Sequence, residues 1–158
     1  MKVIELNDNA LTVYDENGKL CSSAGFARDN GKSLILGDEA EAECKLHPTQ
    51  IYNKFWHQLS VEPLNNSSVR VRHMADLAFA HLQQVAAQAG IKENEPVMLV
   101  VPRSFSREQL GILLGIAKPA GLSIAALLNL ALFSSKAYVS STVEPITQVI
   151  HADMQQHQ

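Results

Sequence analysis

The chain has 158 residues, 46% of them hydrophobic, which is enough for one domain with a sizeable core. Its 13 Lys and Arg against 16 Asp and Glu give a formal net charge of −3, so no net basic field exists to attract nucleic acid. Cys21 and Cys44 are the only cysteines, and the first residues lack the apolar core of a signal peptide. These features favour a cytoplasmic protein that folds without disulfides.

The first 26 residues predict an opening antiparallel meander of three strands. Residues 3–6, 11–14 and 20–26 are β-rich, and Asn17-Gly18 between the second and third runs is typical of a tight turn. A further turn at Asn30-Gly31 precedes Leu34-Ile-Leu36, which we interpret as a continuation of the meander.

Residues 37–68 predict short elements and loops. Asp38 is expected to cap a helix that reaches Leu46, and Pro48 to end it. Residues 51–59 contain three aromatic side chains and predict a second short helix. Among these, Trp56 is expected to lie in the core; the alternative is an exposed patch that binds a partner.

The second half predicts helices that alternate with buried strands. The helices are expected at 71–89, 106–118 and 130–138, and the strands at 97–101, 122–128 and 147–153. Apolar residues three and four apart define the first helix, and Ser106 with Gln109 forms a capping box at the start of the second. The uncharged stretch 119–135 is too interrupted by Pro119 and Gly121 for a membrane span, which needs about 20 mostly apolar residues.

One block of this pattern resembles a known family. Its residues are Val101-Pro102, Phe105, Gln109, Ala120-Gly121-Leu122 and Asn129, followed in register by Ala137-Tyr138. The block resembles the nucleotide-binding domain of the large heat-shock chaperone ATPases, in the actin-like superfamily. Gly37-Asp-Glu-Ala40 is similar to the segment that follows the family's opening meander.

The resemblance implies an α/β fold of the actin-like, or ribonuclease H-like, type. The expected architecture is a mixed sheet with an opening antiparallel meander, helices on both faces and a small inserted subdomain. The core would comprise residues 1–27 and 67–153, with the insertion at about 28–66, so the chain would be a single lobe whose second lobe is absent.

The resemblance also locates the family's phosphate loops. The first follows the first strand, where this sequence has Glu5-Leu6-Asn7-Asp8-Asn9 in place of the family's glycine-containing loop. Glu5, Asn7, Asp8 and Asn9 are therefore weak candidates for nucleotide binding, because Asn7 replaces the glycine and Asp8 adds negative charge beside the phosphates. Asp153 matches the start of the second loop, but no glycine follows it.

The catalytic positions of the family are not retained. The family's catalytic glutamate corresponds to Leu130, which can neither accept a proton nor orient water. The catalytic lysine corresponds to Lys54 or, by alignment on Pro48, to Trp56. No catalytic residue is therefore assigned, and Mg-ATP is expected as a ligand only in a longer chain.

Three functions follow as hypotheses. The favoured one is a non-catalytic actin-like module, an N-terminal fragment of a larger protein, that serves protein interaction or assembly. Its partner would be the second lobe of its own longer chain, another protein, or a second copy that pairs through residues 146–153. The alternatives are the ATP-binding lobe of an active chaperone-type ATPase and a small-molecule kinase of the same superfamily.

Two arrangements that contain histidine are candidate sites. Cys44, His47 and His57 lack the spacing of a zinc site, so no metal is assigned. His81, at the edge of an apolar helix face, is expected to be a partly buried histidine with a backbone partner and not a catalytic base.

Overall fold

Five strands form one mixed sheet in a computed structural model that describes residues 1–7 and 9–141. The strands are β1 (Lys2–Leu6), β2 (Ala10–Asp15), β3 (Gly18–Ala24), β7 (Pro96–Val101) and β8 (Ser123–Asn129), in the spatial order β3-β2-β1-β7-β8. The three N-terminal strands pair antiparallel, whereas β1, β7 and β8 run parallel. The predicted meander and the α/β class with a mixed sheet are confirmed.

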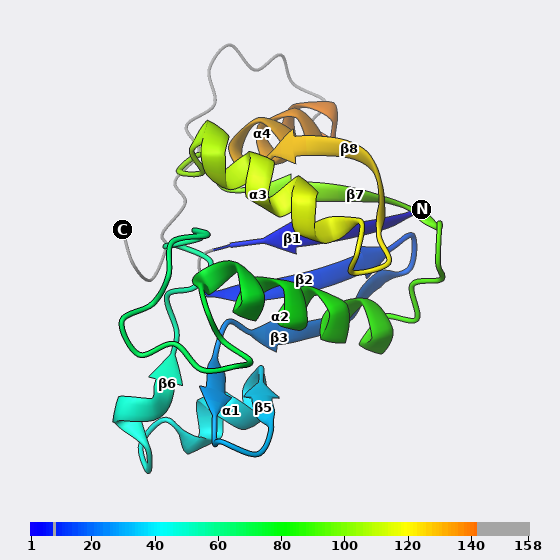
Figure 1. The fold of residues 1–158 in the computed structure, drawn as a ribbon. Helices are drawn as coiled ribbons and strands as arrows, with labels where there is room; N and C mark the ends of the chain where they lie inside the picture. Colours follow the sequence, from blue (N-terminus) through cyan, green and yellow to red (C-terminus); the bar gives the residue numbers. More distant parts are fainter. Residues whose placement is uncertain (8, 142–158) are drawn as a thin grey trace.

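Side chains alternate between the two faces of this sheet. In β1, Ile4 and Leu6 are buried toward α2 (Met74–Gln88) and α3 (Arg107–Ala117), which lie in front of the sheet in Figure 1. Val3 and Glu5 therefore point to the opposite face. Helix α4 (Leu130–Ser141) contacts β7 and β8 and lies behind β8 in the same view.

Helix α3 begins where its local sequence predicts. In α3, the Ser106 hydroxyl accepts the Gln109 N–H at 3.1 Å, and the Gln109 side-chain oxygen accepts the Ser106 N–H at 2.9 Å. This is the predicted capping box, which satisfies two N–H groups that a helix start leaves without partners. The apolar stripe of α2 is likewise buried along its length.

The inserted residues form a second sheet of their own. Its strands are β4 (Ala27–Asp29), β5 (Leu34–Leu36) and β6 (Ile51–Tyr52), in the order β5-β4-β6. The prediction that Leu34–Leu36 continues the opening meander is therefore wrong. The predicted helix at 51–59 is also wrong, because Ile51–Tyr52 pairs with β4 and the following turn carries Phe55 and Trp56 into the core.

The short helix α1 (Asp38–Glu43) differs from its prediction at both ends. It ends at Glu43 instead of Leu46, and a single 3-10 turn, Pro48–Gln50, follows. Gly37, with φ of 71°, occupies the capping position, and Asp38 is the first helical residue. The Asp38 carboxylate instead accepts the Ala24 N–H at 2.9 Å, so it ties the helix to β3.

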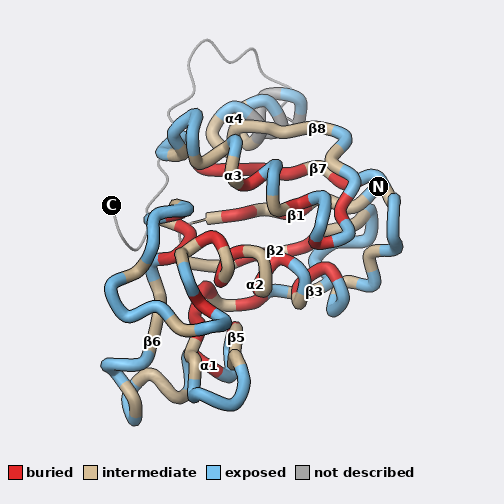
Figure 2. The backbone as a smooth tube through the Cα atoms, viewed as in Figure 1, coloured by how far each residue is buried: buried red, intermediate tan, exposed pale blue. Residues whose placement is uncertain are grey.

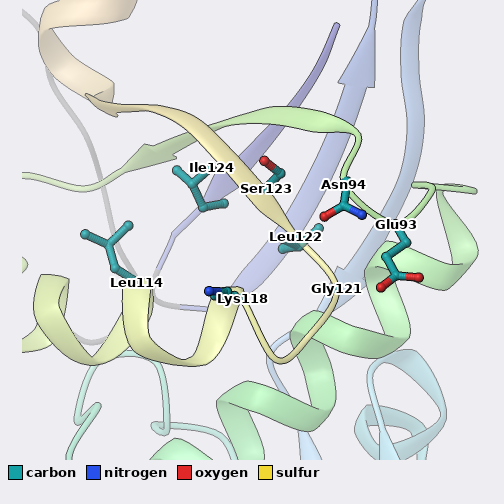
Figure 3. A pocket seen from close by; sticks show the side chains of 8 residues that line it. All are labelled: Glu93, Asn94, Leu114, Lys118, Gly121, Leu122, Ser123 and Ile124. Atoms are coloured by element: carbon teal, nitrogen blue, oxygen red, sulfur yellow. The ribbon is translucent and has the colours of Figure 1, made fainter.

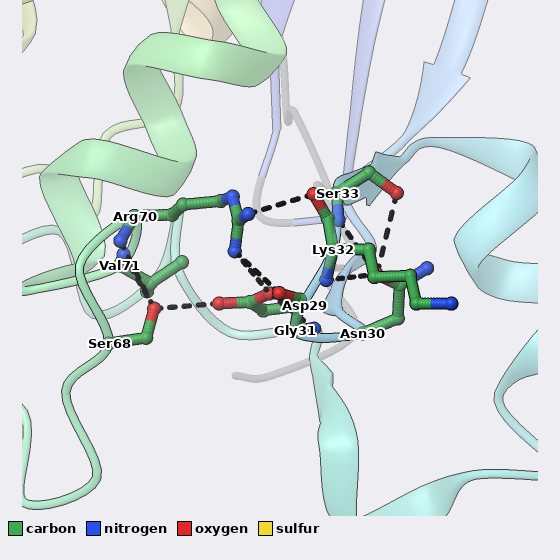
Figure 4. A network of polar contacts seen from close by, with 8 residues as sticks. All are labelled: Asp29, Asn30, Gly31, Lys32, Ser33, Ser68, Arg70 and Val71. Atoms are coloured by element: carbon green, nitrogen blue, oxygen red, sulfur yellow. Dashed lines mark hydrogen bonds and ion pairs between the residues drawn. The ribbon is translucent and has the colours of Figure 1, made fainter.

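A polar network joins the insertion to the loop before α2 (Figure 4). Ser68 donates its hydroxyl to Asp29 at 2.6 Å, and Arg70 lies 3.6 Å from the same carboxylate while donating to the carbonyls of Gly31 and Lys32. The Ser68 hydrogen bond, then the Gly31 N–H and the Arg70 charge, lower the pKa of Asp29 below its usual value. The network fixes the β4–β5 hairpin against the main domain.

One hydrophobic cluster spans both sheets and both front helices. Phe55 and Trp56 from the insertion belong to the same buried cluster as Ile4, Leu99 and Leu113. Figure 2 shows buried backbone along the central strands and the inward side of α2. The predicted strand 147–153 lies outside the described residues, and none of the described helices is long and apolar enough to cross a membrane.

Candidate functional site

Three of the four residues predicted for the first phosphate loop lie within the described structure: Glu5 near the end of β1, and Asn7 and Asn9 in the turn that follows it. Asp8 and Asp153 lie outside the described residues. The Asn7 side-chain oxygen accepts the Asn9 N–H at 3.0 Å, and the Asn7 N–H donates to the Ala10 carbonyl at 3.1 Å. Both N–H groups are therefore used inside the turn and are not presented to a ligand.

The segment after β3 supports the back of this turn. The Gly25 N–H donates to the Asn9 carbonyl at 2.6 Å. A Cβ atom added to Gly25 would lie 2.9 Å from the Asn9 carbonyl carbon, closer than side chains normally approach backbone. Sequence reasoning missed Gly25, because the requirement for glycine arises from two segments that meet only in the folded sheet.

Glu5 and Leu130, two positions singled out by the resemblance, line one hollow. The hollow has a volume of about 320 Å³ and is also lined by Val3, Tyr14 and Val100. Val3 and Tyr14 are paired across β1 and β2, and Glu5 and Val100 across β1 and β7, so these four side chains share the α4 face of the sheet. Leu130 is the first residue of α4 and closes one side.

The chemistry of this hollow is mostly apolar, with one carboxylate–phenol pair. Burial, followed by the charge of Glu5 and a hydrogen bond to its carboxylate, raises the pKa of Tyr14 above its usual value. Tyr14 therefore stays a neutral hydrogen-bond donor to Glu5 at physiological pH. Sequence reasoning missed Tyr14, because it lies on the same face as Glu5 only through the register that pairs Val3 of β1 with Tyr14 of β2.

Asn129, the last residue matched to the family block, has a structural role here. Its side-chain oxygen accepts the Leu132 N–H at 3.3 Å, so it caps the start of α4. Asn129 also lines a second hollow, of about 350 Å³, with Leu128, Leu132 and Lys136. This hollow lies beside β8 and carries one cation and no carboxylate among its described lining residues.

A third hollow lies at the opposite end of the parallel strands (Figure 3). Its volume is about 370 Å³, and its described lining combines residues before β7, the end of α3 and the start of β8: Glu93, Asn94, Leu114, Lys118, Gly121, Leu122, Ser123 and Ile124. Ligands of open α/β sheets bind beyond the carboxyl ends of parallel strands. This hollow is at the amino ends, so we assign it no ligand.

His81 is fully buried, and its partners are the Trp56 indole N–H at 3.0 Å and the Ser23 hydroxyl at 2.9 Å, so the predicted backbone partner is wrong. The buried face of α2 directs the His81 ring between these two side chains.

Trp56 lies in the core, as predicted. The described residues contain no group of three His, Cys, Asp or Glu side chains placed to hold a metal.

No protein-family model matches the chain, and no curated protein matches it significantly.

Proposed function

We propose that the chain is a non-catalytic actin-like module that serves protein interaction or assembly. The observation that carries this proposal is the hollow at the end of β1. Glu5 and Leu130, the positions at which the resemblance expects phosphate and water chemistry, meet there, but Val3, Tyr14 and Val100 form the rest of its described lining. Such a lining offers neither a general base next to a water site nor a cradle of backbone N–H groups.

The sheet topology supports the finer fold assignment. Three antiparallel strands followed by two parallel ones, in the order β3-β2-β1-β7-β8, agree with the ribonuclease H-like arrangement that the resemblance implies. The small second sheet occupies the expected insertion, between β3 and α2. The chain would then be one lobe, and its function would depend on what covers the face that bears the hollow.

The turn after β1 supports the loss of phosphate binding. Phosphate loops depend on backbone N–H groups that point at the ligand. Here the N–H groups of Asn7 and Asn9 are bonded within the turn, and Glu5 places negative charge beside it. The charge of Glu5 would repel a phosphate group, and few backbone N–H groups of the turn would be free to bind it.

The alternative, an ATP-binding lobe of an active ATPase, retains one supporting observation. Glu5 supplies a carboxylate near the carboxyl end of β1, where the resembled family also has one. A longer chain would have to provide every other catalytic group.

Steady-state phosphate release with Mg-ATP tests the proposal. The chain should show no turnover above the buffer background, and Glu5→Ala should not change the rate. Calorimetric titration should give a dissociation constant no tighter than about 1 mM, equivalent to only about 4 kcal/mol of binding free energy. Turnover that Glu5→Ala abolishes, or micromolar affinity, would overturn the proposal.

A further inference from the structure

Glu5 places a carboxylate in apolar surroundings without a cationic partner among the described residues. The other described residues around it are Val3, Tyr14, Val100 and Leu130. Its described polar contact is the Tyr14 hydroxyl. A carboxylate held against apolar surface is stabilised most by a cation that brings hydrogen-bond donors with it.

The chain does not supply this cation from the nearest candidates. Lys2, three residues away in β1, donates instead to Glu95 at 3.1 Å and to the Gly90 carbonyl at 2.9 Å, at the other end of the strand. The terminal residues 142–158 contain neither Lys nor Arg. The described residues therefore leave the Glu5 carboxylate without a counter-charge, which a partner can supply.

We propose, building on the non-catalytic function above, that this hollow receives an arginine side chain of a partner protein. The guanidinium group matches a carboxylate with two parallel hydrogen bonds and stacks on an aromatic ring, so it fits Glu5 and Tyr14 together. Its aliphatic stem covers apolar surface, which Val3, Val100 and Leu130 provide. A lysine ammonium is more strongly hydrated and would use only the charge of Glu5.

Other ligands fit the hollow less well. A divalent cation requires several oxygen ligands, and the described lining offers one carboxylate and one phenol. An anion would be repelled by Glu5. A purely apolar segment would leave the carboxylate buried without a counter-charge, which costs free energy.

The test is a titration of the full chain in which NMR spectra record the chemical shifts of the backbone amides. N-butylguanidinium is the probe, with n-butylammonium and butyrate as comparison ligands. We expect saturable shifts at the amides of Val3, Glu5, Tyr14 and Val100, weaker affinity for the ammonium and no such shifts with butyrate. Absent shifts, or equal shifts with butyrate, would overturn the proposal.

Three variants identify the interaction. Glu5→Gln should weaken guanidinium binding about tenfold by removing a charge-assisted hydrogen-bond pair. Glu16→Gln, which changes an exposed residue in the β2–β3 turn, should leave it unchanged. Leu130→Glu should tighten binding, a gain that misfolding cannot produce. If Glu5→Gln binds as well as the original chain, or Leu130→Glu no better, the proposal fails.

A parallel titration separates this proposal from the proposed function. Submillimolar Mg-ATP binding at the same amides would refute the non-catalytic module and the arginine site together. If neither ATP nor guanidinium shifts those amides, only the arginine site is refuted. Shifts of the same amides with protein concentration alone would show that a second copy occupies the hollow, which also contradicts the arginine partner.

Discussion

His81 connects three parts of the fold through one imidazole ring. The Trp56 indole can only donate, so Nδ1 of His81 must be unprotonated and Nε2 must carry the hydrogen donated to Ser23. The ring is therefore neutral in the folded state. A proton on Nδ1 would face the indole N–H and remove that hydrogen bond.

Protonation of His81 should weaken the fold as the pH falls. Burial, opposed in part by the charge of Asp38, lowers the pKa of His81 from 6.5 to about 4. The unfolded chain therefore binds the proton first, and stability decreases as pH falls from 6.5 toward about 4. At about 1.4 kcal/mol per pKa unit, the loss is about 3 kcal/mol.

Urea denaturation at about pH 7 and about pH 4.5 measures this loss. His81→Gln can still accept from Trp56 and donate to Ser23 but does not titrate, so its stability should vary less between the two pH values. His47→Gln, a change outside the core, should keep the full dependence. A similar dependence in His81→Gln would show that other groups cause it.

The residues around the hollow and the β1–β2 turn differ in how far the sequence predicts them. Glu5 and Leu130 were identified by position in a resembled pattern, and the structure brings both to one hollow. Tyr14 required strand register, which places it opposite Val3. Gly25 depends on contact with the Asn9 backbone, which no local pattern records.

Among the elements, α3 shows how strongly a helix start can be specified locally. Ser106→Ala removes the acceptor for the Gln109 N–H and should lower the free energy of unfolding by about 0.5–2 kcal/mol. Ser104→Ala, at an exposed turn position just before the helix, should change stability much less. Thermal or urea unfolding measures both. Equal effects would mean that the cap contributes little.

Elements with a long, regular pattern were predicted, and those that depend on distant partners were not. The helical spacing of apolar residues at 74–88 and the unbroken apolar run at 97–101 are local patterns, so α2 and β7 follow from the sequence. Strand β6 has only two residues, Ile51–Tyr52, and exists because β4 pairs with it. Likewise, Asp38 suits a helix cap locally, but Ala24 of β3 supplies its hydrogen-bond partner.

The insertion and the main sheet share a core. Phe55, Trp56 and Leu59 belong to the same buried cluster as residues of β1, β7 and α3. Asp29, Ser68 and Arg70 add a polar connection at the outer side. We therefore expect the insertion and the sheet to unfold together, because exposing one would open the core of the other.

Trp56 makes this expectation directly measurable, because it is the only tryptophan in the chain. Its fluorescence reports the insertion, while far-UV circular dichroism reports the helices and sheet of the main domain. In a urea titration the two curves should have the same midpoint and slope. Arg70→Ala, which removes contacts to Asp29 and the β4–β5 turn, should move both curves to lower urea together. A fluorescence midpoint below the dichroism midpoint would show that the insertion opens independently.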